Sequence, residues 1–509
     1  MLQTLRQNAI GALTEIVAGT PLRRVFLGSA RSRVVIFTLH RMADPGNEIC
    51  GHDERVLRLA LRRIHRLRVP IVGLENVLEA ERGGRPLPPV SVCFTLDDGY
   101  HDQADVTLPL LLAHDARPTL FLISGFLDGL LWPWDARVLE FFRLAPRSAV
   151  EVRLGEGRLS LDLRTDETRT EARRCFTALC KTVSDHRREE LIAALAGAVG
   201  IPADLPVPAH HRPMTWDRAR ELEGQGARFG SHSVSHRLFS KLPDSVASQE
   251  LLLSRDRVQA ELASPLPVLA WPIGRQADFG LRDLGLAAQA GYAASVDVFA
   301  EDHVVGESRA NPGHLVLHRH GFPDRARDAT RMILGFHRAL DRWRHAGSPA
   351  ARRMPDLSRV RRLVFVCKGN ICRSPYAESR ARLSGVDALS CGIFAAPGAA
   401  ADPSAQRNAL LREVDLAAHR SQRLDQVDLG PADLLVTMDR THHRAAAGAA
   451  ARTGAQWTDA ASWLRMHGGL HSIADPYGRG DLDFQTAFDL IDDAVEGLLA
   501  AISSARSAA

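Results

Sequence analysis

Short apolar runs alternate with segments of helical periodicity over the first part of the chain. Three runs predict strands: R-V-V-I-F-T-L-H at 33–40, S-V-C-F-T-L at 91–96 and P-T-L-F-L-I at 118–123. Between and around them, a helical spacing of apolar residues predicts helices at Glu54–Leu67 and Val77–Glu81. Because parallel strands need a crossover that is usually a helix, this order predicts an α/β core with parallel strands.

Changes of character along the chain predict its domain organisation. Residues from about 128 to 210 begin with L-W-P-W-D and continue with charged, helix-like stretches, so we interpret them as an insertion between core strands. A helix is predicted at 324–346, and G-S-P-A-A-R-R-M-P-D then has the composition of a linker. The predicted organisation is a helical segment at 1–30, a first domain at 31–322 that includes the insertion, a helix and linker at 323–358, and a second domain at 359–509.

Composition excludes several function classes. The chain has 509 residues with 64 basic and 60 acidic side chains, and a net charge of +4 is too balanced to indicate a nucleic-acid partner. Seven cysteines do not form a disulfide framework in a chain of this length. The apolar residues of the N-terminus are interrupted as in an amphipathic helix, and no stretch approaches the roughly 20 apolar residues of a membrane span. We therefore expect a cytoplasmic protein without a transmembrane segment.

A phosphate-binding loop is predicted where the second domain begins. The apolar strand Leu363–Val366 leads directly into Cys367. Gly369–Asn370 can adopt the positive φ angles of a tight anion-binding loop, and Arg373 presents a planar fork for two phosphate oxygens. Ser374 opens a helix whose N-terminus favours a bound dianion. The same field favours the thiolate form of Cys367, which is the nucleophilic form.

This loop, C-K-G-N-I-C-R-S-P, resembles that of the low-molecular-weight protein tyrosine phosphatases, and the resemblance covers roughly residues 360–502. It implies a doubly wound parallel four-stranded sheet and no cofactor. It also implies that Cys367 forms a phosphocysteine intermediate, that Arg373 binds the phosphoryl group, and that Asp475 of the D-P-Y loop is the general acid and later the general base. Cys372 is implied as a partner for a reversible disulfide. The other residues of the predicted phosphate-binding loop are Lys368, Gly369, Asn370, Ile371, Cys372 and Ser374.

Two carboxylates and two imidazoles indicate a metal site in the first domain. Asp97 and Asp98 end a predicted strand, and adjacent side chains at a strand end point in different directions. His232 and His236 are four residues apart, so both rings can reach one ion. One carboxylate and two histidines leave coordination positions open for water, as a catalytic divalent metal requires.

The flanks of these motifs, T-L-D-D-G-Y and S-H-S-V-S-H, resemble the polysaccharide deacetylases of carbohydrate esterase family 4 over roughly residues 30–322. The resemblance implies a distorted (β/α) barrel, Asp97 as catalytic base, and Zn²⁺ or a similar divalent metal ion on Asp98, His232 and His236. It implies that the backbone N–H of Tyr100 contributes to an oxyanion site. The substrate would be an N-acetylated sugar or polysaccharide.

The first domain departs from that family in two motifs. The stretch L-A-W-P-I-G-R places Arg275 after the glycine, so no arginine is assigned to orient the base. The Leu-x-His motif has no strict match; His314, His318 and His320 are candidates for the general acid, with His318 first. His40 is expected near the metal site, in a structural role at least as readily as in a chemical one.

Together the two resemblances imply a bifunctional hydrolase of surface-polysaccharide metabolism. Its partners would be an acetylated sugar or polysaccharide precursor and a phosphotyrosine protein, such as a bacterial tyrosine kinase of polysaccharide export. One alternative keeps the phosphatase but makes the first domain a non-catalytic, metal-dependent sugar-binding module, which the absent arginine and Leu-x-His motifs favour. A second alternative is an arsenate-reductase-like second domain, against which the retained D-P-Y motif argues.

Overall fold

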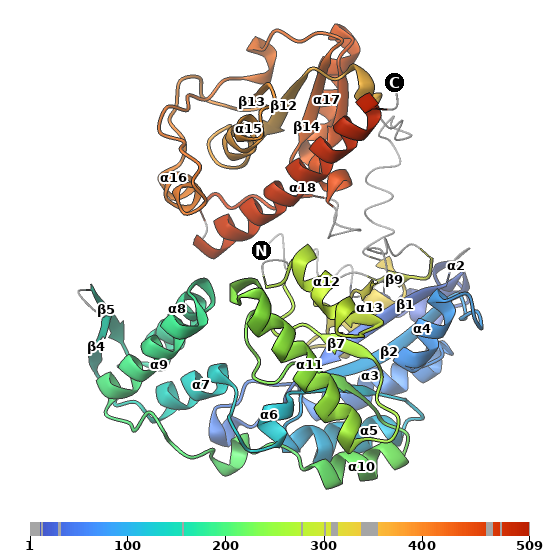
Figure 1. Ribbon diagram of the computed structural model, residues 1–509. Helices are drawn as coiled ribbons and strands as arrows, with labels where there is room; N and C mark the ends of the chain where they lie inside the picture. Colours follow the sequence, from blue (N-terminus) through green and yellow to red (C-terminus); the bar gives the residue numbers. More distant parts are fainter. Residues whose placement is uncertain are drawn as a thin grey trace. The chain divides into compact units, whose positions relative to one another are not determined.

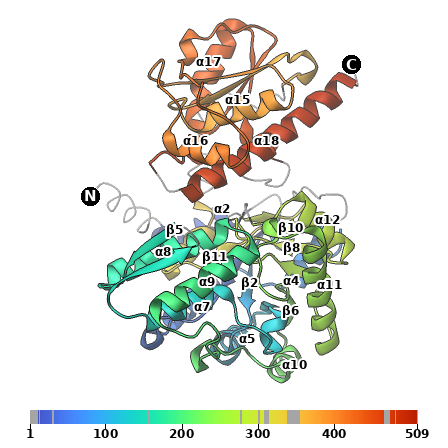
Figure 2. The same ribbon diagram turned by 60° about the vertical axis from the view of Figure 1, so that its left-hand side comes forward.

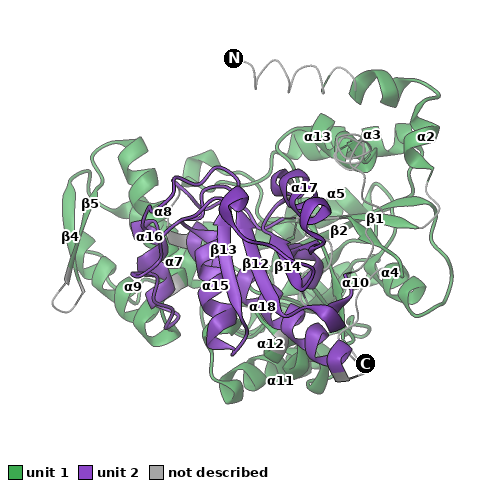
Figure 3. Cartoon of the chain, turned by 90° about the horizontal axis from the view of Figure 1, so that it is seen from above, with its two compact units in different colours: residues 1–344 green, residues 345–509 purple. Residues whose placement is uncertain are grey.

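The protein was analysed as a computed structural model, which divides into the two units Met1–Arg344 and His345–Ala509 (Figure 3). Nearly half of the predicted N-terminal helical segment, the end of the predicted helix at 324–346 and most of the linker lie outside the described residues. The structure describes residues 11, 14–28, 32–154, 157–275, 278–299, 302–306, 314–336, 355–464, 472–478 and 481–507.

The first unit is built on a nine-stranded sheet whose main path runs β10-β8-β7-β6-β3-β2-β1-β11. Its pairings along this path are parallel, and β9 pairs antiparallel with β1. The three strands predicted from the apolar runs are β1, β2 and β3, which confirms the parallel α/β core. The strands of this sheet are β1 (Arg33–Leu39), β2 (Val90–Asp98), β3 (Thr119–Leu122), β6 (Arg228–Ser231), β7 (Val268–Ala270), β8 (Ala294–Val296), β9 (His303–Val304), β10 (Leu315–Leu317) and β11 (His320–Gly321).

The two ends of this path are neighbours in the chain. Only His318 and Arg319 separate β10, which pairs with β8, from β11, which pairs with β1. Two residues cannot span the width of an open sheet, so the sheet must curl round until its ends meet. This closure gives the barrel-like form predicted for the first domain, and it puts Arg319 next to the carboxyl end of β2.

Helices pack around the barrel and connect its strands (Figure 1). The predicted helix Glu54–Leu67 is α3, and Val77–Glu81 forms the end of α4. A π-helical turn, η2 (Gln103–Thr107), follows the carboxyl end of β2. The helices are α2 (Arg23–Leu27), α3 (Glu54–Leu67), α4 (Leu74–Glu81), α5 (Leu108–Leu112), α6 (Ser124–Leu127), α10 (Trp216–Gly224), α11 (Asp244–Glu261), α12 (Leu281–Gln289) and α13 (Ala326–Ile333).

The predicted insertion forms a subdomain with its own apolar core. It contains α7 (Trp134–Leu144), α8 (Asp166–Thr182) and α9 (Asp185–Val199), which gather to one side of the barrel (Figure 2). A core that includes Phe141, Phe176 and Leu195 holds these helices together. The prediction of helices was incomplete, because β4 (Ala149–Leu154) and β5 (Gly157–Asp162) form an antiparallel hairpin within it.

The second unit is a four-stranded parallel sheet of order β13-β12-β14-β15, as predicted for the doubly wound fold. Apolar clusters cover both of its faces, one with α15, α16 and α18 and the other with α17. Its elements are β12 (Arg362–Cys367), α15 (Arg373–Leu383), β13 (Ala388–Gly392), α16 (Pro403–Leu410), β14 (Asp433–Thr437), α17 (His443–Thr453), β15 (Gln456–Asp459) and α18 (Asp481–Ser507). Within the described part of the whole chain, no helix is long and apolar enough to span a membrane.

Candidate active sites

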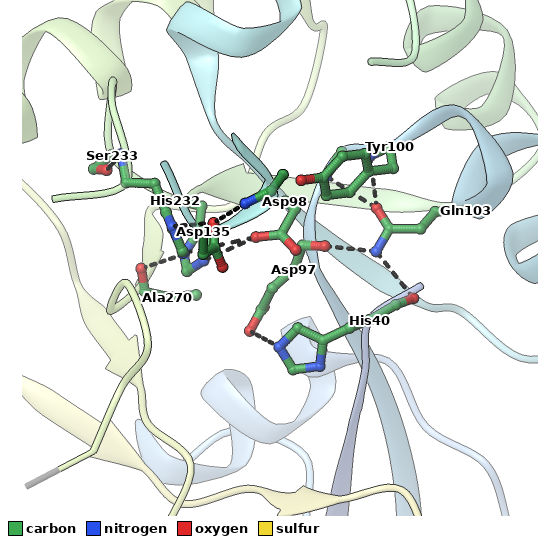
Figure 4. Close-up of polar contacts among 12 residues, drawn as sticks. His40, Asp97, Asp98, Tyr100, Gln103, Asp135, His232, Ser233 and Ala270 are labelled. Carbon is green, nitrogen blue, oxygen red and sulfur yellow. Dashed lines mark hydrogen bonds and ion pairs between the residues drawn. The ribbon is translucent and has the colours of Figure 1, made fainter. Parts of the chain in front are cut away.

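The carboxyl end of β2 brings Asp97 and Asp98 into the mouth of the barrel (Figure 4). Both side chains are nearly buried. The chain turns sharply here, with a φ of 88° at Asp98 and 96° at Gly99. A positive φ is unfavourable for a residue with a side chain, so the surrounding structure must hold Asp98 in this conformation, as is common at functional sites.

Asp98 faces the two histidines that follow β6. Its Oδ1 lies 3.6 Å from Nε2 of His232 and 3.7 Å from Nε2 of His236. One ligand atom from each of the three residues lies within 4.8 Å of the other two. Nδ1 of His232 is 2.8 Å from the carbonyl oxygen of Ala270, which directs Nε2 of that ring to Asp98.

The donor set of this cluster fits a divalent cation. Burial, Asp135 and Asp97 together raise the pKa of Asp98 well above its usual range, so the site holds more negative charge than its surroundings compensate. Burial lowers the pKa of His232 to about 3, which keeps the imidazole in the neutral form that binds metals. Two neutral imidazoles and one carboxylate are a set that Zn²⁺ accepts.

A second cluster of possible ligands, Glu140, His210 and His211, has a different character. Both carboxylate oxygens of Glu140 accept hydrogen bonds from Arg143, at 2.6 and 2.7 Å. Nδ1 of His211 lies 3.0 Å from a guanidinium nitrogen of Arg41. Arg143 already compensates the carboxylate of Glu140, and Arg41 occupies a ring nitrogen of His211, so we interpret the cluster as a structural network that ties the insertion to the barrel.

Arg319 binds the carboxylate of Asp97 with both terminal nitrogens, at 2.7 and 2.8 Å. Its Nε donates to the carbonyl oxygen of Asp297, and its side chain is fully buried. The expectation that the base has no arginine partner is therefore wrong: the arginine comes from the β10–β11 junction instead of the stretch around Arg275. Burial alone would raise the pKa of Asp97, but Arg319 and His232 outweigh it and hold that pKa well below its usual range.

The N–H of Tyr100 is engaged within the protein. It donates to Oε1 of Gln103 at 2.9 Å, and the N–H of Gly99 donates to the same oxygen at 2.9 Å. Gln103 also donates to the carbonyl oxygens of Asp97 and His40, at 2.5 and 3.2 Å. The oxyanion role predicted for Tyr100 is not supported by this geometry, since Gln103 would first have to release the N–H.

The three histidines considered for the general acid differ in their surroundings. Nε2 of His314 lies 2.9 Å from the hydroxyl of Ser295, and Nε2 of His320 lies 2.9 Å from Asp302; both rings are buried. Nδ1 of His318 lies 2.8 Å from the fully buried carboxylate of Asp297. Only His318 combines a carboxylate partner with a partly exposed ring, which keeps it the first candidate.

His40 lies at the rim of the same site. Its Nε2 is 3.9 Å from Oδ2 of Asp97, and 51% of its side chain is exposed (Figure 4). His40 is thus found near the cluster of Asp98, His232 and His236, as expected, and it approaches the same Oδ2 of Asp97 that accepts a hydrogen bond from Arg319.

In the second unit, the loop after β12 wraps around the sulfur of Cys367. The hydroxyl of Ser374 is 2.9 Å from this sulfur, and the N–H of Asn370 donates to it at 3.2 Å. Asn370 has a φ of 54°, as predicted, whereas Gly369 is not in the positive-φ region. Hydrogen bonds from a hydroxyl and a backbone N–H stabilise a thiolate, so the loop is suited to a nucleophilic sulfur.

Side chains from outside the loop fix its conformation. Nδ2 of Asn370 donates to the hydroxyls of Ser374 and Ser390, and its Oδ1 accepts from the N–H of Gln422. His419 has its Nε2 2.8 Å from the carbonyl oxygen of Asn370. None of the three residues His419, Ser390 and Gln422 was assigned to this loop from the sequence, because each lies at least 16 positions beyond it and only the fold brings them to it.

Arg373 contacts two carboxylates at once. One terminal nitrogen lies 2.9 Å from Oδ2 of Asp475, and the other lies 2.8 Å from Oδ2 of Asp439. The same nitrogen that binds Asp439 donates to the carbonyl oxygen of Ile473 at 2.7 Å. Sequence reasoning assigned Arg373 and Asp475, and the structure brings them together; it missed Asp439, which directly follows the core strand β14 and Met438.

The remaining thiols of this unit are buried. Burial raises the pKa of both Cys372 and Cys391 well above that of an ordinary thiol. Cys391 packs in the apolar cluster that also contains residues of α17. Tyr477 of the D-P-Y loop is instead exposed over 62% of its surface.

Comparisons with known proteins find one family in each unit. The family model of low molecular weight phosphotyrosine protein phosphatases matches residues 362–508, and that of polysaccharide deacetylases matches 183–294, which includes His232 and His236. A probable low molecular weight protein-tyrosine-phosphatase, EpsP of Ralstonia nicotianae, is 33% identical over 146 residues, which are 27% of this chain and 92% of the relative. A protein-arginine-phosphatase of Geobacillus stearothermophilus is 39% identical over 85 residues, 16% of this chain and 56% of that protein.

Solved structures similar to each unit are also known. The tyrosine phosphatase AmsI of Erwinia amylovora is 26% identical with a TM-score of 0.25, and the match covers 28% of this chain and 93% of that one. The deacetylase PplD of Streptococcus pyogenes, in complex with acetate, is 15% identical with a TM-score of 0.39, and the match covers 60% of this chain and 99% of that one.

Proposed function

The chain belongs, through its second unit, to the low molecular weight phosphotyrosine protein phosphatase family, and its first unit carries a polysaccharide deacetylase domain; from this premise we propose that one chain performs two hydrolyses at separate sites. The first unit removes an acetyl group from an N-acetylated sugar or polysaccharide precursor. The second unit dephosphorylates a phosphotyrosine protein through a phosphocysteine intermediate.

In the first unit, Asp97 is the general base. Asp98, His232 and His236 would hold a divalent cation such as Zn²⁺, whose chemistry when bound is to polarise a carbonyl and to acidify water. Asp97 accepts a proton from the attacking water, and Arg319 keeps its carboxylate ionised and oriented. His318, held by Asp297, then donates a proton to the amine nitrogen as the C–N bond breaks, leaving acetate and an amino sugar.

The observation that carries this proposal is the bidentate Arg319–Asp97 pair. A base without an orienting partner would favour the alternative of a non-catalytic sugar-binding module, and the pair removes that argument. Acetate release from N-acetylated oligosaccharides with Zn²⁺ supplied tests the proposal, with Asp97→Asn as the matched variant. The proposal requires release by the parent protein and its loss in Asp97→Asn, with sugar binding retained; sugar binding without release by the parent protein would establish the alternative.

In the second unit, the thiolate of Cys367 attacks phosphorus. The bond between phosphorus and the tyrosine oxygen breaks, and Asp475 donates a proton to the leaving oxygen. Water then attacks the phosphocysteine, Asp475 takes its proton, and the S–P bond breaks to release phosphate. Arg373 binds the equatorial oxygens in both steps, which requires that it exchange Asp475 for the phosphoryl group.

Hydrolysis of p-nitrophenyl phosphate and of phosphopeptides tests this half. We expect Cys367→Ser to abolish phosphatase turnover while acetate release by the first unit continues, which shows that the first unit of the variant is folded. Because one relative is named a protein-arginine-phosphatase, the peptides should include phosphoarginine as well as phosphotyrosine. Arsenate reduction with thiol reductants would support the arsenate-reductase alternative, against which the burial of both Cys372 and Cys391 argues.

We place both reactions in surface-polysaccharide metabolism, in the cytoplasm. The support is the combination of the two proposed activities in one chain. The first unit would act on acetylated sugars, and the second would act on a regulatory phosphoprotein. We propose a bacterial tyrosine kinase of polysaccharide export as that phosphoprotein. Seven free cysteines, a reactive one among them, favour a reducing compartment. Deletion of the chromosomal gene should change both the acetylation of the surface polymer and the phosphotyrosine content of cellular proteins.

A further inference from the structure

One nitrogen of a proposed metal ligand faces no acceptor at hydrogen-bond distance. His236 is 5% exposed, and its Nε2 is directed to Asp98 at 3.7 Å. Its Nδ1 is buried and has no hydrogen-bond partner among the described residues. A neutral imidazole that binds a metal through Nε2 carries its proton on Nδ1, so this nitrogen is a buried donor that needs an acceptor.

The companion ligand has such an acceptor. Nδ1 of His232 lies 2.8 Å from the carbonyl oxygen of Ala270, within the barrel. The two ligands therefore differ: the barrel orients the ring of His232, whereas no described residue of the barrel accepts a hydrogen bond from Nδ1 of His236. His236 also has a φ of 56°, so its backbone is held in an unfavourable region while its ring lacks an anchor.

A carboxylate of the insertion lies close to this nitrogen. Oδ1 of Asp135 lies 3.9 Å from Nδ1 of His236, too far for a hydrogen bond but within reach of a small side-chain rotation. Asp135 lies in the first turn of α7, where its Oδ1 accepts from the N–H of Ala136 at 3.1 Å. Figure 4 shows its side chain on the same side of Asp98 as His232.

The position of Asp135 is set by the core of the insertion. The preceding Trp134 is 3% exposed, packs in the apolar core of the insertion, and has the guanidinium of Arg188 over its ring at 5.1 Å. Asp135 does not belong to the three residues whose ligand atoms lie within 4.8 Å of one another. Its place is behind the ring of His236, which is the place of an outer-shell acceptor and not of a fourth ligand.

We propose that Asp135, supplied by the inserted subdomain, accepts the Nδ1 proton of His236 and so positions this ligand for the metal. The inference rests on the proposed metal-dependent function of the first unit. It makes the insertion part of the metal site: the barrel provides the three ligands, and the insertion orients one of them. Carboxylates in this position orient the ring and raise its basicity, and their loss typically lowers metal affinity 10- to 100-fold.

The test is the affinity of the full-length protein for Zn²⁺, measured by competition with a chromophoric chelator, together with the visible spectrum of the Co²⁺ form. We expect Asp135→Asn and Asp135→Ala to weaken Zn²⁺ binding about 10- to 100-fold, and Asp135→Glu to retain most of the affinity. Glu189→Gln is the matched control, because Glu189 also belongs to the insertion and pairs with Arg137 of α7 at 2.5 Å. It should bind Zn²⁺ as the parent protein does.

The outcomes separate this inference from the proposed function. If the parent protein binds Zn²⁺ and the Asp135 variants bind it equally well, the positioning role is overturned while the metal site stands. If the parent protein binds no Zn²⁺, the proposed function fails and the inference with it. A Co²⁺ spectrum of Asp135→Asn that reports one protein ligand fewer would overturn the outer-shell role in favour of direct ligation.

Discussion

Arg319 and Arg373 are both almost completely buried, and each binds the carboxylate that its site would use to move a proton. The partners differ in exposure: the side chain of Asp97 is 3% exposed and that of Asp475 is 40% exposed. Arg319 holds Asp97 with two hydrogen bonds, whereas Arg373 divides its contacts between Asp475 and Asp439. The first pair can persist through a reaction cycle, but the second must open, because the phosphoryl group needs the same guanidinium.

The comparison teaches that one kind of ion pair serves two purposes. In the first unit the arginine orients the carboxylate of Asp97, the proposed base, and favours its ionised form. In the second unit the more exposed Asp475 carboxylate binds the guanidinium that would receive the phosphoryl group, and in the proposed mechanism it donates a proton once substrate has displaced it. Burial of the acidic partner is what separates the two cases, since water screens an exposed pair and weakens it.

The largest expected effect is on the rate of the second site. Asp475→Asn keeps the size of the side chain but removes the proton, so we expect kcat for aryl phosphates to fall about 10²- to 10⁴-fold, or about 2.7–5.4 kcal/mol of barrier. The effect should shrink for substrates with good leaving groups, which need little protonation. A loss of the same size for good and poor leaving groups would show that Asp475 is not the general acid.

The next effect is on the stability of the first unit. Arg319→Met leaves the Asp97 carboxylate buried without a partner, and we expect a loss of about 3–5 kcal/mol in the free energy of unfolding. Adding Asp97→Asn should restore much of it, because the uncompensated charge disappears. Arg117→Met is the control, since Arg117 meets Glu75 at 3.5 Å on the surface and should cost under about 1 kcal/mol. Equal losses of unfolding free energy in Arg319→Met and Arg117→Met would show that the buried Arg319–Asp97 pair contributes no more than the surface Arg117–Glu75 pair.

Much of this architecture could be predicted from the sequence. The Arg319–Asp97 and Arg373–Asp439 pairs show what could not be predicted. Apolar runs identified β1, β2, β3 and β12, and motif spacing identified Asp97 and Cys367 beside them. Arg319 was not identified as the partner of Asp97, because the two residues are 222 positions apart in the sequence. Only the closure of the barrel by β10 and β11 brings them together.

Two other features were missed for different reasons. The hairpin β4–β5 alternates apolar and polar residues, a strand signal that the charged stretches around it obscured. Asp439 was missed because a single aspartate after an apolar strand is an ordinary strand end; only its contact with Arg373 distinguishes it. Local patterns predict elements, whereas pairs between distant segments depend on tertiary closure.

The stability of the second unit should depend on pH, with an effect of intermediate size. His442 is fully buried beside Asp439, and burial lowers its pKa to about 4. An unfolded histidine has a pKa of about 6.5, so the neutral form stabilises the fold above pH 6.5, and that stability is lost as the pH falls toward 4. The difference amounts to about 3 kcal/mol. Hydrogen exchange of peptides from β14 and α17 between pH 7 and pH 4 should reveal the loss, and His442→Gln should reduce its slope.

The smallest expected effect is on the affinity of the second site for phosphate. Its direction tests whether the Arg373–Asp475 pair opens for substrate while the Arg319–Asp97 pair persists. If Asp475 competes with phosphate for Arg373, then Asp475→Asn should bind inorganic phosphate more tightly, by up to about five-fold, since a half-exposed pair is worth up to about 1 kcal/mol. Asp439→Asn should act in the opposite direction, because Asp439 holds the guanidinium that receives the phosphate. Inhibition constants of phosphate for the two variants measure both changes. Weaker phosphate binding by Asp475→Asn would mean that Asp475 does not compete with phosphate. The Asp475–Arg373 pair would then be a lasting structural pair, as the Asp97–Arg319 pair is expected to be.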